Sequence, residues 1–152
     1  MAGLGCALAL ARDGHRVTIV ERDDTPMPAN PDDAFAHWER RGAPQVRHSH
    51  AFLARLRLLL LERAPDVHAA LMAAGAAELR FTDQLPPTLT DLSPYPGDDD
   101  LVAIACRRTT FEWVLRRAAL AEDGVELRHG VSADGLVVDP SHPHNGVPVV
   151  RG

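Results

Sequence analysis

The first 21 residues constrain the fold more than any other stretch of the chain. Residues 3–13 are dominated by Ala and Leu and are followed by Gly14, a pattern typical of a helix with a glycine cap. Residues 16–21 read RVTIVE, a nearly continuous apolar run that predicts a strand buried in a parallel sheet. A helix followed by a strand that ends in an acidic residue is typical of the later part of a β-α-β nucleotide site.

Gly3 and Glu21 are the candidate ligand-binding residues of this unit. Gly3 fits the third glycine of the nucleotide fingerprint, which allows the helix to pack closely on the sheet. Glu21 lies close to the usual ~20 residues further on, where an acidic side chain accepts hydrogen bonds from ribose hydroxyls. The first strand and the first two glycines would precede Met1, so we expect no pyrophosphate-binding loop. An ordinary helix-turn-strand of another α/β fold would give the same pattern.

The rest of the chain alternates helical and strand-like segments, which predicts one α/β domain over residues 1–152. We expect this to be a partial Rossmann-like domain, truncated at both ends, with a long loop over residues 23–45. Ser49 and Asp66 are predicted helix caps. Helices are expected over residues 51–63, 66–74 and 109–121, and strands over 78–82, 101–106, 125–128, 131–138 and 147–150.

Composition excludes several classes of protein. Hydrophobic residues make up 45% and charged residues 24%, which argues against disorder. All 16 basic residues are Arg, and the net charge of −5 gives no reason to expect a nucleic-acid partner. No apolar run reaches the ~18 residues of a membrane span. The isolated Cys6 and Cys106 predict buried free thiols in a reducing compartment, and hence a cytoplasmic protein.

Neither a metal site nor a nucleophile is indicated. The pairs His48/His50 and His142/His144 lack the converging third and fourth ligands of a metal site, and the second pair is expected in a solvated, Pro-rich turn. No Gly-x-Ser-x-Gly elbow is present. We therefore assign no catalytic side chain.

Three segments, in the same order along the chain, carry a resemblance to a known family. Residues 3–22 read GLGCALALARDGHRVTIVER, residues 41–53 read RGAPQVRHSHAFL, and residues 106–117 read CRRTTFEWVLRR. They are similar to the end of an FAD fingerprint, to an R-G-V-P-Q…H-x-H-x-L segment and to an R-x-x-L-E-x-x-L segment. Together they resemble the FAD-dependent oxidoreductases of the para-hydroxybenzoate hydroxylase type, which include flavin monooxygenases and halogenases.

The resemblance implies roles for individual residues. Glu21 would bind the adenosine ribose, and Arg22 would lie near the adenosine or its phosphate. Arg108 would contact the ribityl-diphosphate region of FAD, where its planar fork suits phosphate oxygens; a solvated Arg in a first helical turn is the alternative. Three further positions are implied: Ala133 at the adenine pocket, and Gln45 and His50 in a loop on the isoalloxazine side.

The resemblance also implies a reaction class. FAD would be the cofactor, NAD(P)H the reductant, and a small organic molecule the substrate of an O₂-dependent monooxygenase. Family members are more than twice as long. A parallel sheet without its first central strand leaves apolar neighbours and backbone donors unpaired, so we expect this chain alone to fold marginally and to bind FAD weakly or not at all. Two alternatives stay open: a catalytically silent remnant that acts as a binding module, and an NAD(P)-binding Rossmann protein without flavin. The oligomeric state is not indicated.

Overall fold

The computed structural model describes residues 1–43, 45–144 and 147–150, and it shows a mixed α/β chain. The elements follow one another as α1 (Ala2–Arg12), β1 (Val17–Glu21), α2 (Pro31–His37), β2 (Ser49–Phe52), α3 (Ala54–Arg63), α4 (Pro65–Ala73), β3 (Ala77–Arg80), β4 (Val102–Arg107), α5 (Arg108–Ala121), β5 (Val125–His129), β6 (Val138–His144) and β7 (Val147–Val150). Two short 3-10 turns, η1 (Phe81–Gln84) and η2 (Asp98–Asp100), lie between β3 and β4.

Three small sheets organise the described residues. β1 and β5 pair in parallel, from Val17 opposite Val125 to Glu21 opposite His129. β2 and β3 flank β4, and both run antiparallel to it. β6 and β7 form a separate antiparallel hairpin. The chain therefore contains both parallel and antiparallel sheets.

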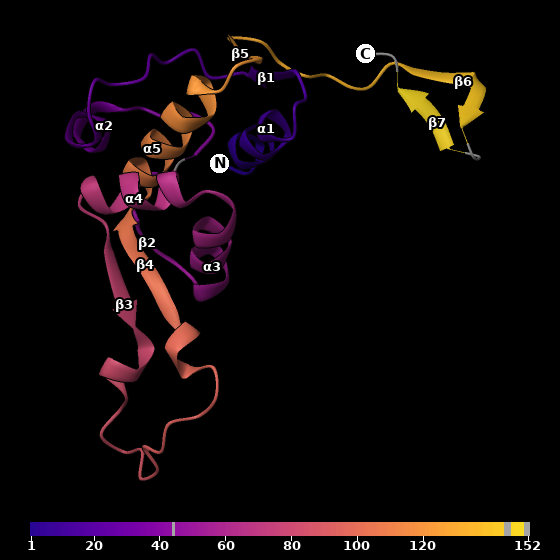
Figure 1. Cartoon of the computed structure of the whole chain (residues 1–152). Coiled ribbons are helices and arrows are strands. Elements are labelled where there is room, and N and C mark those ends of the chain that lie inside the picture. The colour runs from indigo at the N-terminus through magenta and orange to yellow at the C-terminus, as the bar shows by residue number, and fades with distance from the viewer. Residues whose placement is uncertain (44, 145–146, 151–152) are drawn as a thin grey trace.

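Helix α5 lies at the centre of the packed part of the molecule (Figure 1). It contacts α1, α2 and α4 as well as β4 and β5. Side chains from several elements meet around it, and Leu71 of α4 and Ile104 of β4 are fully buried there. The core is thus built mainly of helix faces packed against α5.

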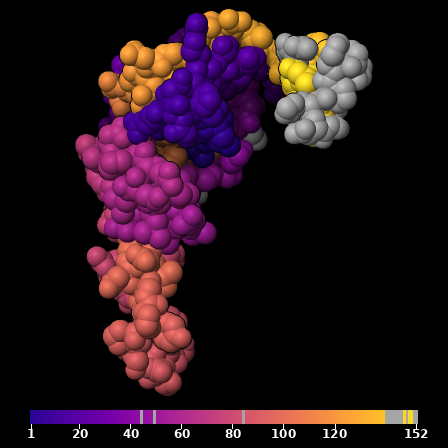
Figure 2. Space-filling model, turned by 45° about the vertical axis from the view of Figure 1, so that its right-hand side comes forward, coloured from indigo at the N-terminus to yellow at the C-terminus, as the bar shows by residue number. Residues whose placement is uncertain are grey.

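Two parts project from this core. The antiparallel β3–β4 ribbon carries the connection over residues 81–101 away from the helices, and both views show it standing free (Figures 1 and 2). The β6–β7 hairpin lies apart at the other end, joined to β5 by residues 131–137, which are exposed and have no regular structure (Figure 1).

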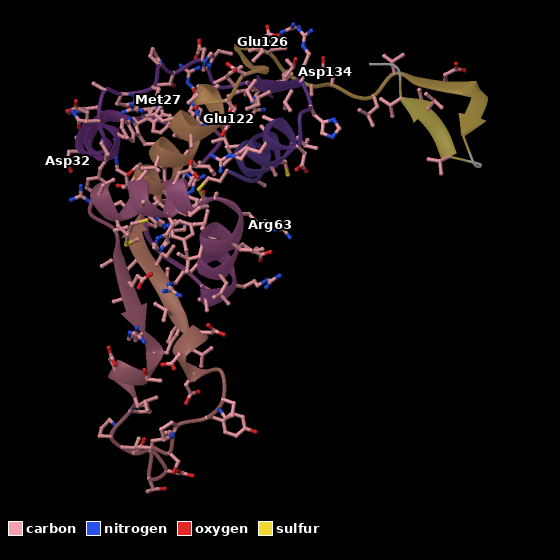
Figure 3. All side chains as sticks on the ribbon, in the orientation of Figure 1. Met27, Asp32, Arg63, Glu122, Glu126 and Asp134 are labelled. Atoms are coloured by element: carbon pink, nitrogen blue, oxygen red, sulfur yellow. The ribbon has the colours of Figure 1, made fainter. Side chains whose placement is uncertain are left out.

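Arg12 fixes the end of α1 to two other helices. Its guanidinium donates to both carboxylate oxygens of Asp66 on α4, at 3.0 and 2.7 Å, and its Nε donates to Glu122 at 2.7 Å. Figure 3 labels Glu122 beside the end of α5. These contacts hold α1 in place over the parallel strands.

The predictions for α1 and for the position of β1 are confirmed. Gly14 has a φ of 86° after the last turn of α1, a conformation that glycine adopts without strain. The predicted full burial of β1 is wrong, because half-buried and exposed residues alternate along it and Val20 is 46% exposed. Only one face of the two-stranded sheet is covered by helices, so the strand shows the alternation of a half-buried sheet.

The predicted loop over residues 23–45 contains a helix that the prediction missed. Asn30 caps α2 by accepting a hydrogen bond from the backbone N–H of Asp33 at 2.8 Å, and Pro31 occupies the first turn. Both are standard signals of a helix start. The sequence N-P-D-D was therefore sufficient to predict the start of α2.

Replacing Asn30 with Ala is expected to destabilise the protein by about 1 kcal/mol, because the substitution removes the cap of α2. Urea denaturation followed by circular dichroism measures the change. Asn30→Asp keeps an acceptor at the same place and should restore most of the loss. Equal losses in both variants would contradict a capping role.

The predicted cap at Ser49 is wrong, since Ser49–Phe52 forms β2 and α3 begins at Ala54. The backbone of β2 pairs with β4, an interaction between distant segments that helical periodicity cannot reveal. Asp66 lies in the first turn of α4 but does not cap it, because Pro65 already occupies the first helical position.

The other elements agree with the prediction in type, except at the C-terminal end. β3, β4, α5 and β5 lie within a few residues of their predicted positions, and β7 is confirmed as a strand. The strand predicted over 131–138 does not form; β6 begins only at Val138. His142 and His144 lie in β6 rather than in a turn, and the Asn145–Gly146 turn lies outside the described residues.

The cysteines are not both buried as predicted. Cys6 is exposed on α1, whereas Cys106 is half-buried, and burial raises the pKa of the Cys106 thiol to about 11. Among the described residues no helix is long and apolar enough to cross a membrane.

Candidate functional site

A pocket of about 140 Å³ lies at the carboxyl end of the parallel strands. We call it the strand-end pocket. It is lined by the start of α1, the last three residues of β1 and Leu127 of β5, together with the side chains of Arg40, Glu112 and Arg116. Ligands of α/β proteins characteristically bind at this end of parallel strands.

Three larger hollows have a different character. One, of about 790 Å³, lies within the projecting connection 81–101, and another, of about 670 Å³, is an apolar groove between α1 and α3. The third, of about 430 Å³, lies between α4 and α5. None of them contains the buried charged side chains that line the strand-end pocket. We therefore place the candidate site at the strand-end pocket.

Arg40 holds three carboxylates at this site. Its two terminal nitrogens donate to Glu21 and Asp23, each at 2.9 Å, and its Nε lies 2.9 Å from a carboxylate oxygen of Glu112. The backbone N–H of Asp23 also donates to Glu21 at 3.0 Å. The position of the Glu21 carboxylate at the end of β1 is therefore fixed before any ligand arrives.

Arg108 and Glu112 extend this arrangement into the core. Glu112 is only 2% exposed, and its second oxygen lies 3.3 Å from Arg108, one turn earlier on α5. Arg108 is 9% exposed, so it is not the solvated surface residue considered as the alternative. We call Glu21, Asp23, Arg40, Arg108, Glu112 and Arg116 the charge cluster.

Arg116 differs from the other two arginines of the charge cluster. One of its terminal nitrogens lies 3.2 and 3.3 Å from the ring nitrogens of His129, and its guanidinium lies 5.5 Å from the Trp38 ring centroid. The guanidinium of Arg40 lies 5.1 Å from the same ring. Burial and the nearby positive charge of Arg40 lower the pKa of Arg116 below its usual value.

The carboxylates at the strand end have lowered pKa values. Burial alone would raise the pKa of Asp23, but hydrogen bonds from the Thr25 hydroxyl and backbone N–H, together with the charge of Arg40, bring it below its ordinary value. The pKa of Glu21 is lowered in the same way, with burial outweighed by the Asp23 N–H and Arg40. Both groups thus favour the ionised state in the folded chain.

Acid is expected to destabilise the protein through these carboxylates. A group whose pKa is lower in the folded state stabilises the fold above its unfolded pKa, and this contribution disappears as the pH falls through the folded value. Stability should therefore decline below about pH 4. Urea denaturation at a series of pH values measures it. Asp23→Asn should give a flatter profile below that pH; an unchanged slope would exclude Asp23 as a contributor.

Gly3 lines the strand-end pocket, but the packing role predicted for it is not seen. It is exposed on α1, and a Cβ built at this position would meet nothing within 4 Å. No neighbour among the described residues therefore requires glycine here. The position is open toward the pocket.

The other predicted positions lie away from the strand-end pocket. Arg22 is exposed just after β1 and forms no hydrogen bond or ion pair within the described part of the chain. Ala133 is exposed in the segment 131–137, and Gln45 is exposed before β2. His50 lies on β2, where its ring stacks on Phe52 at 6.2 Å. Of the predicted residues, the structure brings Gly3 and Glu21 together in the pocket.

Sequence reasoning missed four members of the charge cluster. Arg108, Glu112 and Arg116 are spaced four residues apart, which places them on one face of a helix, so Glu112 and Arg116 could have been found from Arg108. Asp23 follows closely after β1 but resembles any loop acid. No pattern in the neighbouring sequence indicates a role for Arg40, because its three partners come from distant parts of the sequence.

Among the residues that the structure describes, no group of three or more side chains could hold a metal ion. The strand-end pocket is bordered by carboxylates that pair with guanidinium groups. No protein-family model matches the chain, and no curated protein is significantly similar to it.

Proposed function

We propose that this chain is the FAD-binding part of a flavin-dependent oxidoreductase, a cytoplasmic monooxygenase that uses NAD(P)H and O₂ on a small organic substrate. The observation that supports it most is the strand-end pocket. There the beginning of α1 and the carboxylate of Glu21 face one cavity at the end of a parallel strand pair. This is the arrangement that binds the adenosine half of a dinucleotide.

The residues present fit the ribose of such a cofactor. Two hydrogen bonds, from Arg40 and from the Asp23 backbone, already reach Glu21, one to each oxygen. A carboxylate offers about four lone-pair sites, so acceptor capacity is left for ribose hydroxyls. Arg40 keeps Glu21 ionised and oriented. The pocket of about 140 Å³ is smaller than the ~300–1,000 Å³ of a whole ligand site, so it would receive only part of the cofactor.

When bound, FAD would supply the redox chemistry, and this chain's residues would bind and orient it. Glu21 would accept hydrogen bonds from the ribose, and Arg40 and the backbone N–H of Asp23 would hold Glu21 in place. The apolar side chains of Leu4, Ile19 and Leu127 would exclude water beside the ribose.

An NAD(P)-binding protein without flavin is the second candidate. Arg108, which the resemblance implies beside the ribityl-diphosphate of FAD, is paired with Glu112 and does not line the strand-end pocket. The pocket itself serves an adenosine ribose from either cofactor. The resemblance of the three sequence segments is what favours FAD.

The test is a titration of the ¹⁵N-labelled chain with FAD, NAD⁺ and AMP, followed by amide NMR shifts. We expect weak binding, with a dissociation constant of about 1 mM, and shifts centred on Gly3, Glu21 and Leu127. FAD should bind more tightly than NAD⁺. The absence of shifts around the pocket for all three ligands, in a folded protein, would rule out the proposal.

The variant Glu21→Gln tests whether the Glu21 side chain takes part in binding. Loss of a charged acceptor should weaken AMP binding by about tenfold or more. Glu126→Gln is the matched control, because Glu126 lies on neighbouring β5 in an exposed pair with Arg128. Equal affinities of the two variants for AMP would show that Glu21 does not contribute to the site.

A further inference from the structure

Arg116 is a buried cation that lacks an anionic partner. It is 3% exposed, and within the described part of the chain it forms no ion pair. Its Nε also has no hydrogen-bond partner there. A buried charge without a counter-ion is unfavourable, so proteins usually pair such groups.

The surroundings of Arg116 explain why no carboxylate forms an ion pair with it. Glu21, Asp23 and Glu112 are the nearest acidic groups, and all three are engaged by Arg40. What touches Arg116 is the ring of His129 and the face of Trp38. Arg116 therefore presents an unsatisfied donor at the wall of the strand-end pocket.

A second source of positive potential faces the same pocket. The 11-residue helix α1 begins there, with no side-chain cap and no acidic residue in its first turn. The free N–H groups and the dipole of a helix N-terminus attract anions. Two independent features, on α1 and on α5, thus favour a negative group in one cavity.

We propose that Arg116 is the anchor for a phosphate group of the ligand, which it holds against the first turn of α1. The inference rests on the proposed function and deepens it, because it requires a phosphorylated ligand rather than a nucleoside. Glu21 would select the ribose and Arg116 the phosphate. The planar guanidinium suits two phosphate oxygens at once.

The experiment compares AMP, adenosine and inorganic phosphate as probes of the full chain by NMR titration. Arg116→Gln should weaken AMP and phosphate binding about tenfold or more and leave adenosine binding unchanged. Its unliganded denaturation midpoint should change little, because removal of an unpaired buried charge offsets the lost contact with the Trp38 ring. Arg117→Gln is the matched control, an exposed arginine on the same helix. Unchanged AMP affinity in Arg116→Gln would overturn the inference.

Gly3→Asp keeps the test decisive if the first variant fails to fold. The position has open space around it, and an acidic residue suits the first turn of a helix. The added carboxylate should repel phosphate and AMP, and should therefore weaken their binding far more than that of uncharged adenosine. A folded Gly3→Asp protein that binds phosphate normally would contradict the proposal.

The two proposals fail in different ways. If AMP binding depends on Glu21 but not on Arg116, the nucleotide site stands and the phosphate anchor is wrong. If inorganic phosphate binding depends on Arg116 while no adenosine ligand depends on Glu21, the anchor stands and the nucleotide function is wrong.

Discussion

Replacing Glu112 with Gln is expected to destabilise the protein by about 3–5 kcal/mol, since it removes one partner of a buried ion pair. Glu112 is 2% exposed and contacts both Arg40 and Arg108. Without its charge, two buried guanidinium groups lose a counter-ion. Since a small domain has only about 5–15 kcal/mol of stability, this is a large fraction of the total.

Urea denaturation followed by circular dichroism measures this effect. Glu126→Gln is the control, because Glu126 pairs with Arg128 on the surface, where an ion pair contributes little. Its denaturation midpoint should be unchanged. Similar midpoints for the two variants would show that the charge cluster does not stabilise the fold.

Trp38→Ala is expected to destabilise the chain by about 3–5 kcal/mol, because it removes a large aromatic side chain from the core. Trp38 is 1% exposed and lies under the guanidinium groups of Arg40 and Arg116. Ala would leave a cavity and also remove the aromatic face that both cations contact. The loss can be followed by the fluorescence of Trp113 during urea unfolding.

Trp38→Phe separates the aromatic face from the indole nitrogen. Trp38 Nε1 has no hydrogen-bond partner among the described residues, so Phe removes no bond. We expect a clearly smaller loss than for Ala. Equal losses would mean that the two arginines gain nothing from an aromatic ring beneath them.

Local patterns predicted the elements whose cause is local. The cap at Gly14 and the apolar run over residues 16–21 were sufficient for α1 and β1, and Asn30 with Pro31 carried enough information for α2. β2 depends on pairing with β4, so helical periodicity misled the prediction there. Residues 131–137 read VSADGLV, and apart from the hydrogen bond that the Val131 N–H donates to the Glu21 carbonyl they form no strand, because Ser, Ala, Asp and Gly at their centre have low strand propensity.

The candidate site was predictable only in part, for the same reason. Glu21 follows from its place at the end of a strand, and Arg108 from a segment pattern. Arg40 joins β1 to α5 through contacts that exist only after folding. The lack of an anionic partner for Arg116 depends on those contacts too, because Arg40 forms ion pairs with the acidic side chains nearest to Arg116.

The extended segment 131–137 acts as a tether between β5 and the β6–β7 hairpin. Nine residue steps separate His129, at the end of β5, from Val138, at the start of β6, and they span at most about 32 Å, so the start of the hairpin stays within that radius of the end of β5. Any group carried by β6 or β7 therefore meets the body of the chain at an effective concentration in the ~mM range. Even a weak contact between the two would be formed much of the time.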